Sequence, residues 1–414
     1  MPELRILLTE ATSASAREVL TVLGRRGHVV DVLHSGGVSL TARSRWVRRR
    51  YSSPAFAVDP IAYLDRLRQI LSSTEYDVVL PTHEQLVALS RFADEFGELA
   101  GLAVPPFDAV RILQDKAAAA GLLDRLGLPQ PATRLVHSPD ELRAATELPA
   151  YIKLPVATSS RGVWLAGDEE QLAAVAELAA VRETLASGSA VLIQQPVTGT
   201  LLMVQAVYDH GRLVGAHTAV RRREGVQGSA SAKESIQRPD VVEHLTRLGA
   251  ELRWHGPLSI DAILDEQDRP RYIDVNPRLV EPVNAELAGA ELVDRWLAVS
   301  RGATPGPRPA ARAGVRTHML LMAILRHAEV GHGRWAILRE LAAAVRRRGW
   351  YADSQEELLP VREDLVGAAF LVAITGCLLV SPALWKQLGG SGAPAHTLSP
   401  GGWKWLTQAS DRSG

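Results

Sequence analysis

Two short strand patterns separated by a polar turn constrain the fold of this chain more than any other feature. Residues 258–264 mix β-branched and aliphatic side chains, residues 265–270 have the composition of a turn, and residues 271–276 again alternate as a strand. If those six polar residues are the whole turn, Leu264 pairs with Arg271 in an antiparallel hairpin. The pattern therefore predicts a β-hairpin with a fixed register.

This register places two acidic side chains directly opposite each other. Asp261 faces Asp274, and Asn276 lies two residues further along the same face of the second strand. Facing carboxylates repel and destabilise a hairpin, whereas a bound divalent cation removes the repulsion, and Mg²⁺ takes such oxygens together with substrate phosphates. A solvated acidic hairpin explains the same pattern equally well, and a slip of one residue would separate the two carboxylates.

The whole chain limits the class of protein. Its 414 residues suffice for two or three packed domains, and its formal net charge of zero argues against nucleic acid as the main partner. Cys377 is the single cysteine, which excludes an internal disulfide. The first residues lack the long apolar core of a signal peptide, so we expect a cytoplasmic protein.

The first hundred residues alternate between strand and helix patterns. Residues 4–8 and 28–33 have strand composition, and residues 14–26 between them have helical spacing. This order predicts a Rossmann-like βαβ opening. The first turn, residues 9–13, contains no glycine, so the dinucleotide-binding fingerprint is absent.

Lysine is rare in this chain, which contains five lysines against 41 arginines. Lys116 lies near the start of a predicted helix over 108–126, and Lys153 lies on a predicted strand before a polar loop. A lysine retained among so many arginines indicates a place for a compact ammonium group. Lys233, in contrast, falls in the polar stretch 221–235, which predicts a mobile loop with this lysine at the surface.

These features occur in an order that resembles the ATP-grasp superfamily, in the branch of carbamoyl-phosphate synthase large chains and carboxylate–amine ligases. The resemblance spans roughly residues 1–300. It implies an α/β protein with a Rossmann-like domain over 1–110 and an ATP-grasp fold over 111–300, in which two α+β subdomains clasp ATP. A linker and a mainly helical region would follow over 301–414.

The resemblance also implies roles for individual residues. Lys116 and Lys153 would hold ATP phosphates, with Lys153 and Arg278 acting on the transferred phosphoryl group. The remaining nucleotide contacts would be the loop residues Ser159, Ser160, Arg161 and Gly162 and the hinge residues Gln194, Gln195, Pro196 and Val197. The ligands of Mg²⁺ or Mn²⁺ would be Asp261, Asp274 and Asn276.

Two positions depart from the family pattern. Gln195 stands where the hinge usually has a glutamate, and Leu201 stands where a ribose-binding glutamate is expected. Asp261 and Asp274 replace the commoner glutamates, which shortens their reach by one methylene. Glu281 and Asn284, just after the second hairpin strand, are further candidate substrate contacts.

The resemblance implies a ligase that activates a small carboxylate as an acyl phosphate with ATP and joins it to an amine. Two alternatives stay open: a phosphotransferase that ends at a phosphorylated product, and a catalytically weak nucleotide-binding protein at a membrane. Residues 365–385 form an uncharged run of 21 residues, long enough for a membrane span, although a buried helix or a membrane contact is the preferred interpretation. The oligomeric state is open, with a homodimer as one option.

Overall fold

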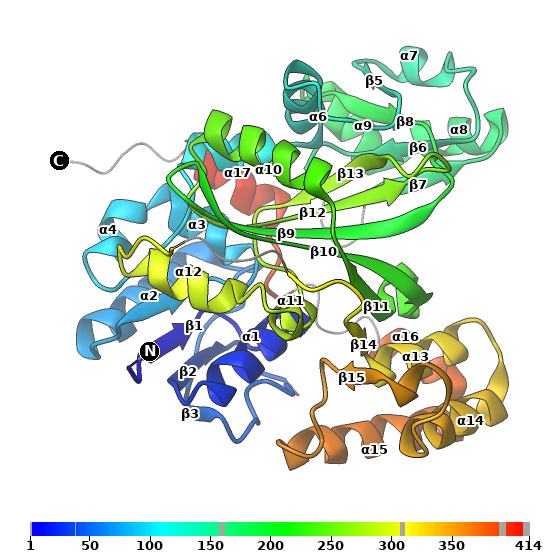
Figure 1. The fold of residues 1–414 in the computed structure, drawn as a ribbon. Helices are drawn as coiled ribbons and strands as arrows, with labels where there is room; N and C mark the ends of the chain where they lie inside the picture. The colour runs from blue at the N-terminus through cyan, green and yellow to red at the C-terminus, as the bar shows by residue number, and fades with distance from the viewer. Residues whose placement is uncertain (1, 38, 157–161, 307–310, 389–394, 409–414) are drawn as a thin grey trace.

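The N-terminal part of the chain forms a parallel sheet between helices. The computed structural model describes residues 2–37, 39–156, 162–306, 311–388 and 395–408 (Figure 1). Its first sheet has the order β3-β2-β1-β4, and every pair of neighbouring strands is parallel. The elements are β1 (Arg5–Leu8), α1 (Ala14–Arg25), β2 (Val29–His34), β3 (Val47–Ser52), α2 (Pro60–Ser73), β4 (Val78–Leu80), α3 (Gln85–Arg91), α4 (Ala93–Gly97) and α5 (Phe107–Gln114). The predicted Rossmann-like opening is therefore confirmed.

A second, smaller sheet has its own hydrophobic core. Its strands have the order β5-β8-β6-β7, and its helices cover buried residues such as Ile152, Leu172 and Ile193. The elements are α6 (Lys116–Arg125), β5 (Thr133–Val136), α7 (Pro139–Arg143), β6 (Ala150–Lys153), β7 (Val163–Ala166), α8 (Glu169–Ala176), α9 (Ala179–Ala186) and β8 (Val191–Gln194). This unit lies at the top right of Figure 1, beside β13.

The central sheet has seven strands in the order β13-β12-β9-β10-β11-β14-β15. Helix α10 packs on it, and α11 and α12 lie between it and the N-terminal domain (Figure 1). The elements up to residue 300 are β9 (Thr200–Asp209), β10 (Arg212–Glu224), a 3₁₀ turn (Val226–Gly228), β11 (Ala230–Ile236), α10 (Pro239–Leu252), β12 (Gly256–Leu264), β13 (Pro270–Asn276), α11 (Val283–Ala288) and α12 (Leu292–Ser300).

The C-terminal region adds two strands to that sheet and is otherwise helical. Short strands β14 (Arg316–His318) and β15 (Ser354–Glu356) extend it beyond β11. The remaining elements are α13 (Leu320–Glu329), α14 (Gly333–Val345), a 3₁₀ turn (Gly349–Ala352), α15 (Leu365–Val380), a 3₁₀ turn (Pro382–Leu384), α16 (Trp385–Leu388) and α17 (Pro400–Gln408). Helix α17 packs back on the N-terminal domain, where Trp405 lies 5.9 Å from Phe92 between ring centroids.

Two local predictions are wrong. The helix predicted over 108–126 breaks at Asp115, because this residue caps α6 by accepting hydrogen bonds from the backbone N–H groups of Ala117 and Ala118. The loop predicted over 221–235 is mostly strand, since β10 and β11 pair across a short 3₁₀ turn. Sheet pairing in the interior thus overrides the polar composition of that stretch.

The apolar run at 365–385 forms a short helix followed by a turn. Helix α15 covers 16 residues, and Leu365, Val372 and Val380 on it are exposed. Within the described part of the chain, no helix combines the length and the apolar character that crossing a membrane requires.

A buried ion pair connects α1 to the start of α15. Arg17 Nη1 lies 2.8 Å from Asp364 Oδ2, and both side chains are 1% exposed. Burial lowers the pKa of Arg17, although the Asp364 carboxylate opposes this shift. The neighbouring pair Arg25–Glu363 joins the same two segments at 2.6 Å but is exposed.

We expect Asp364→Asn to destabilise the fold strongly, because it leaves the Arg17 guanidinium buried without a countercharge. Breaking a buried pair in this way costs about 3–5 kcal/mol, whereas an exposed pair contributes about 0–1 kcal/mol. Denaturant unfolding of Asp364→Asn and of the matched control Glu363→Gln measures the difference. Equal losses in the two variants would show that the buried pair contributes no more than the exposed one.

Candidate functional site

The two carboxylates of the hairpin face each other, as the sequence predicts. Asp261 pairs with Asp274 and Ser259 with Asn276, but a bulge between Asp261 and Ala262 shifts the pairs nearer the turn. Leu264 therefore pairs with Pro270, and the predicted Leu264–Arg271 pairing is wrong. The turn is one residue shorter than predicted, and the bulge, which adds one residue to β13, restores the register at the carboxylates.

The facing pair changes the chemistry of Asp261. Loss of surrounding water, followed by the charge of Asp274, raises the pKa of Asp261 to about 7. The guanidinium of Arg278 and the ammonium of Lys233 oppose this shift. A cation between the two carboxylates would therefore stabilise chiefly the ionised form of Asp261.

Of the two lysines singled out in the sequence, Lys116 contacts the second carboxylate, and Lys153 lies near enough to feel its charge. Lys116, the first residue of α6, has its Nζ 2.9 Å from Asp274 Oδ1. Its backbone N–H donates to the carbonyl of Pro155, 2.8 Å away, which ties the start of α6 to the end of β6. The structure thus brings Lys116 and Asp274 together from elements 158 residues apart in the sequence numbering.

Lys153, the last residue of β6, is buried beside this pair. Its Nζ donates to Gln194 Oε1 at 2.6 Å and to the carbonyl oxygen of Ile273 at 3.1 Å. Burial lowers the pKa of Lys153 to about 8, with Asp274 opposing the shift and Lys116 adding to it. The two ammonium groups together carry more positive charge than the Asp274 carboxylate between them neutralises, and this excess favours the binding of an anion.

The predicted hinge lies at the end of β8. Gln194 is buried, and its amide also donates to Thr133 Oγ1 at 3.0 Å, so its side chain joins β5 to the ammonium of Lys153. The backbone N–H of Gln195 donates to the carbonyl of Ala132 at 2.9 Å. Pro196 is exposed and Val197 is half-buried. The hinge is therefore buried at Gln194 and partly exposed from Gln195 onward.

The predicted phosphate loop is described at one residue. Ser159, Ser160 and Arg161 lie outside the described residues, whereas Gly162 has a φ of 76°, the left-handed conformation that favours glycine. The carbonyl of Gly162 accepts from the backbone N–H of Leu154 at 2.8 Å. This bond closes the loop directly after the strand that carries Lys153.

Arg278 links the hairpin to the N-terminal domain. Its backbone N–H donates to the carbonyl of Asn276 at 2.7 Å, and its Nη1 lies 3.8 Å from Oε1 of the buried residue Glu84. Both Asn276 and Arg278 are half-buried. Glu84 immediately precedes α3, so the N-terminal domain helps to orient this arginine.

A buried ionic cluster next to the hairpin escaped the sequence analysis. Lys233, predicted at the surface, is 3% exposed, and its Nζ lies 2.6 Å from Glu281 Oε2 and 2.7 Å from Glu357 Oε2. Glu18 of α1 is also buried there, and its carboxylate accepts from the backbone N–H of Val283. Although burial alone lowers the pKa of Lys233, the three carboxylates raise it above its ordinary value.

A signal for this cluster exists in the sequence. Lys233 is one of five lysines. Ser231, Lys233 and Ser235 occupy every second position of β11, so these three side chains point to one face of the sheet. Asn284, the other candidate substrate contact, has its amide oxygen 2.8 Å from His217 and its amide nitrogen 2.7 Å from Thr317. These bonds within the fold favour a structural role for Asn284.

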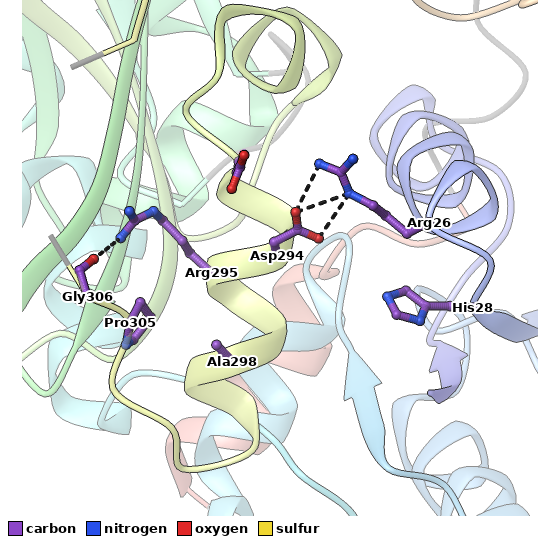
Figure 2. Close-up of a pocket in the computed structure, with 8 residues that line it drawn as sticks. Arg26, His28, Asp294, Arg295, Ala298, Pro305 and Gly306 are labelled. Atoms are coloured by element: carbon purple, nitrogen blue, oxygen red, sulfur yellow. Dashed lines mark hydrogen bonds and ion pairs between the residues drawn. The ribbon is translucent and has the colours of Figure 1, made fainter. Parts of the chain in front are cut away.

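The cavity at the two lysines is small. The described residues around Lys116, Lys153, Gln194 and Asp274 enclose about 30 Å³ between α6 and β13. A larger cavity of about 450 Å³ lies elsewhere, between the end of α1 and α12, where Arg26 and Asp294 form an ion pair (Figure 2). None of the predicted site residues that the structure describes lines that larger cavity.

Comparison with known proteins finds similarity in structure only. No protein-family model and no curated protein sequence matches this chain. The structure is similar to the biotin carboxylase domain of the 2-oxoglutarate carboxylase from Hydrogenobacter thermophilus, solved with MgADP, ADP and bicarbonate. That match has 16% identity and a TM-score of 0.59, and it covers 76% of this chain and 74% of the other.

Two further solved structures have the same similarity. The L-amino acid ligase from Bacillus licheniformis has 18% identity and a TM-score of 0.55, with 74% of this chain and 76% of that chain covered. An ADP complex of N5-carboxyaminoimidazole ribonucleotide synthetase has 13% identity and a TM-score of 0.60, with 83% and 86% covered. At these identities, the likeness establishes the fold alone.

Proposed function

We propose that this chain, which has the ATP-grasp fold, is an ATP-dependent ligase that joins a carboxylate to an amine. Its fold is α/β, with a Rossmann-like N-terminal domain, two α+β units that face each other, and a mainly helical C-terminal region. We assign residues 1–110, 111–300 and 301–414 to these three parts. The carboxylate–amine chemistry of the L-amino acid ligase supports the proposal by analogy of fold.

The proposed reaction has two steps. An oxygen of the substrate carboxylate attacks the γ-phosphorus of ATP, the bond to ADP breaks, and an acyl phosphate forms. The amine nitrogen then attacks the acyl carbon, phosphate leaves, and the amine loses a proton. No side chain of the protein has to act as a nucleophile, so the chain contributes positioning and charge neutralisation.

The observation that carries this proposal is the meeting of two carboxylates and two ammonium groups at one place. Asp261 and Asp274 face each other on β12 and β13, and Lys116 and Lys153 both act on Asp274 from the smaller unit. A triphosphate with its cation needs both kinds of group within a few ångströms. The smaller unit and the central sheet each supply half of the set.

The residues present fit a divalent cation. The donors are hard oxygens, from Asp261, Asp274 and the amide of Asn276, which suit Mg²⁺ or Mn²⁺. A cation would remove the repulsion by Asp274 that, after burial, is the next largest cause of the raised pKa of Asp261, about 7. When bound, the ion would neutralise the charge that develops on the transferred phosphoryl group.

The phosphates would take the place of Asp274 as the partner of the lysines. Lys116 is bound to Asp274 at 2.9 Å, so a cation on that carboxylate would free its ammonium for a phosphate oxygen. Lys153, Gly162 and the loop residues Ser159, Ser160 and Arg161 would complete the phosphate site. Arg278 would steady the transferred phosphoryl group from the hairpin side, and Gln194–Val197 would contact the base.

The cluster around Lys233 is suited to the amine substrate. Glu281 is the most exposed of its carboxylates, at 21% of the side chain, and its charge acts on Asp261. Glu281 also has a φ of 47°, a strained conformation that its neighbours must hold, and such strain clusters at functional sites. We assign Glu281 to bind the amine substrate as an ammonium and to accept the proton that it releases before its nitrogen attacks; the second proton, lost after the attack, leaves with the phosphate.

Product analysis tests this function. The full chain is incubated with MgATP and pairs of small carboxylic acids and amines, and ADP, phosphate and the condensed product are measured. Release of ADP and phosphate in equal amounts, together with an amide, is expected. Formation of ADP with a stable phosphorylated product would favour the phosphotransferase instead, and ATP binding without any turnover would favour a catalytically weak nucleotide-binding protein.

We expect Asp261→Asn to stabilise the protein without metal, and more so at higher pH. In the native state the pKa of Asp261 is raised to about 7, whereas an unfolded aspartate has a pKa of about 3.9. The native state therefore loses stability as the pH rises from about 4 to about 7, and the asparagine variant does not have this loss. Melting temperatures in EDTA at pH 4.5 and pH 8 measure it.

The same variant should respond less to the ligand. A ligand that binds only the native state stabilises it by about 2.7 kcal/mol at a hundredfold excess over Kd. MgATP should thus raise the melting temperature of the wild type more than that of Asp261→Asn, and ATP with EDTA should raise it little. A variant that is less stable in EDTA yet has the full MgATP shift would contradict the cation assignment.

A further inference from the structure

Two histidines and an aspartate meet at one end of the central sheet, away from the hairpin carboxylates. Strand β9 ends at Asp209, His210 and Gly211 form a tight turn with φ of 45° and 93°, and β10 begins at Arg212. His255 directly precedes β12, whose first residue, Gly256, pairs with Tyr208. The register therefore brings His255 beside the turn that carries the other two residues.

The three side chains face one another closely. The imidazole rings of His210 and His255 are stacked, with centroids 3.9 Å apart and an angle of 12° between their planes. His255 Nδ1 lies 3.9 Å from Asp209 Oδ1, and one ligand atom of each residue lies within 4.8 Å of the others. Tetrahedral zinc with ligands at about 2.0–2.1 Å holds its donor atoms about 3.3–3.4 Å apart. The stacked rings direct their in-plane lone pairs in parallel, so the exposed His210 ring has to turn out of the stack before its nitrogen can reach an ion held by Asp209 and His255.

The carboxylate of Asp209 is held in one orientation. Its Oδ2 accepts from Arg212 Nη2 at 3.2 Å and from Thr304 Oγ1 at 3.3 Å, while Oδ1 faces His255. Metal sites commonly have such hydrogen bonds to the second oxygen of a ligating carboxylate, because they fix the direction of the first. The orientation needed for a metal ligand is thus present in the folded chain.

The two imidazoles are suited to a borderline metal ion. His210 is exposed and free to adjust, and His255 is half-buried with Nδ1 accepting from the backbone N–H of His210 at 3.3 Å. Zinc on this nitrogen would replace the weak hydrogen bond from His210, and the ring would ligate without losing a proton.

We propose that Asp209, His210 and His255 form a zinc site, in which water completes the coordination. Two nitrogen donors and one oxygen donor favour Zn²⁺ over Mg²⁺. The site is separate from the proposed nucleotide cation, since Gly256 and Asp261 are five residues apart on one strand, which is roughly 17 Å. Zinc would clamp the β9–β10 turn to the start of β12 and, through Thr304, to the segment after α12.

Zinc titration of the metal-free full chain tests this site, with millimolar Mg²⁺ present to saturate sites made only of oxygen ligands. The wild type should bind one zinc ion, and His210→Asn and His255→Asn should each lower the affinity at least tenfold. Asparagine tolerates the positive φ at position 210, and at position 255 it keeps an acceptor for the His210 N–H. Unchanged melting temperatures in EDTA would show that the variants fold.

His332→Ala is the matched control, because His327 and His332 form another close histidine pair, with their Nδ1 atoms 3.1 Å apart. This control should bind zinc as the wild type does, and zinc should raise its melting temperature equally. The proposal is overturned if the wild type binds no zinc at micromolar concentration, if the two asparagine variants bind it as tightly as the wild type, or if His332→Ala alone removes the binding.

Discussion

Asp274→Ala is expected to lower ATP turnover roughly a hundredfold to a thousandfold, a loss typical of removing a group that stabilises charge in the transition state. Asp274 faces both Asp261 and Lys116, so its removal disrupts the cation site and the phosphate site together. Steady-state ADP release with saturating MgATP measures the effect, once a substrate pair has been found.

The matched control is Glu266→Ala, which removes an acidic, exposed side chain from the turn of the same hairpin. It should leave turnover within a factor of two of wild type, because an exposed turn residue touches neither lysine. Asp274→Asn, which keeps the size of the side chain, should behave like the alanine variant. If either Asp274 variant retained near wild-type turnover, as Glu266→Ala should, the assignment of the cation site would be wrong.

Lys153→Met is expected to weaken ATP binding roughly tenfold to a hundredfold, because a hydrogen bond to a charged group contributes about 1.5–3 kcal/mol. Methionine fills a similar volume and removes only the ammonium group. Its Nζ is buried between Gln194 and the backbone of Ile273, so no other lysine can replace it without rebuilding that contact. Fluorescence or calorimetric titration with MgATP gives the dissociation constant.

Two exposed lysines provide controls for this measurement. Lys386→Met and Lys404→Met remove the same charge from α16 and α17, where both side chains are exposed. Their affinity for ATP should equal that of the wild type. Equal affinities across all three variants would exclude a phosphate contact by Lys153, and a lowered melting temperature in Lys153→Met alone would instead indicate a structural role.

The hairpin shows how a sequence prediction can succeed for an incomplete reason. Alternation of polar and apolar residues placed both strands correctly, and Asp261 does face Asp274. The pairing near the turn was wrong, because the turn is one residue shorter and Ile273 is the extra residue of a bulge. Bulges have no strong sequence signature, so neither the shorter turn nor the extra residue was predicted. The two errors cancel at the carboxylates, and the predicted pairing of Asp261 with Asp274 is therefore correct.

The Lys233 cluster was missed for a different physical reason. Its partners Glu18, Glu281 and Glu357 come from three distant segments, and no local pattern records that they meet. A stretch containing Arg, Gly and Ser has the composition of a loop, yet pairing with β10 and β14 makes it an interior strand. Tertiary context therefore decided both its structure and the burial of its lysine.

The bond between Lys233 and Glu357 has a consequence for the folding of this protein during its synthesis on the ribosome. The two residues are 124 positions apart, and β15, which ends just before Glu357, is the last strand of the central sheet. At about 5–20 residues per second, synthesis of the intervening segment takes roughly 6–25 s. During that interval the nascent sheet lacks its final strand, and Lys233 has Glu18 and then Glu281, but not Glu357, as countercharges.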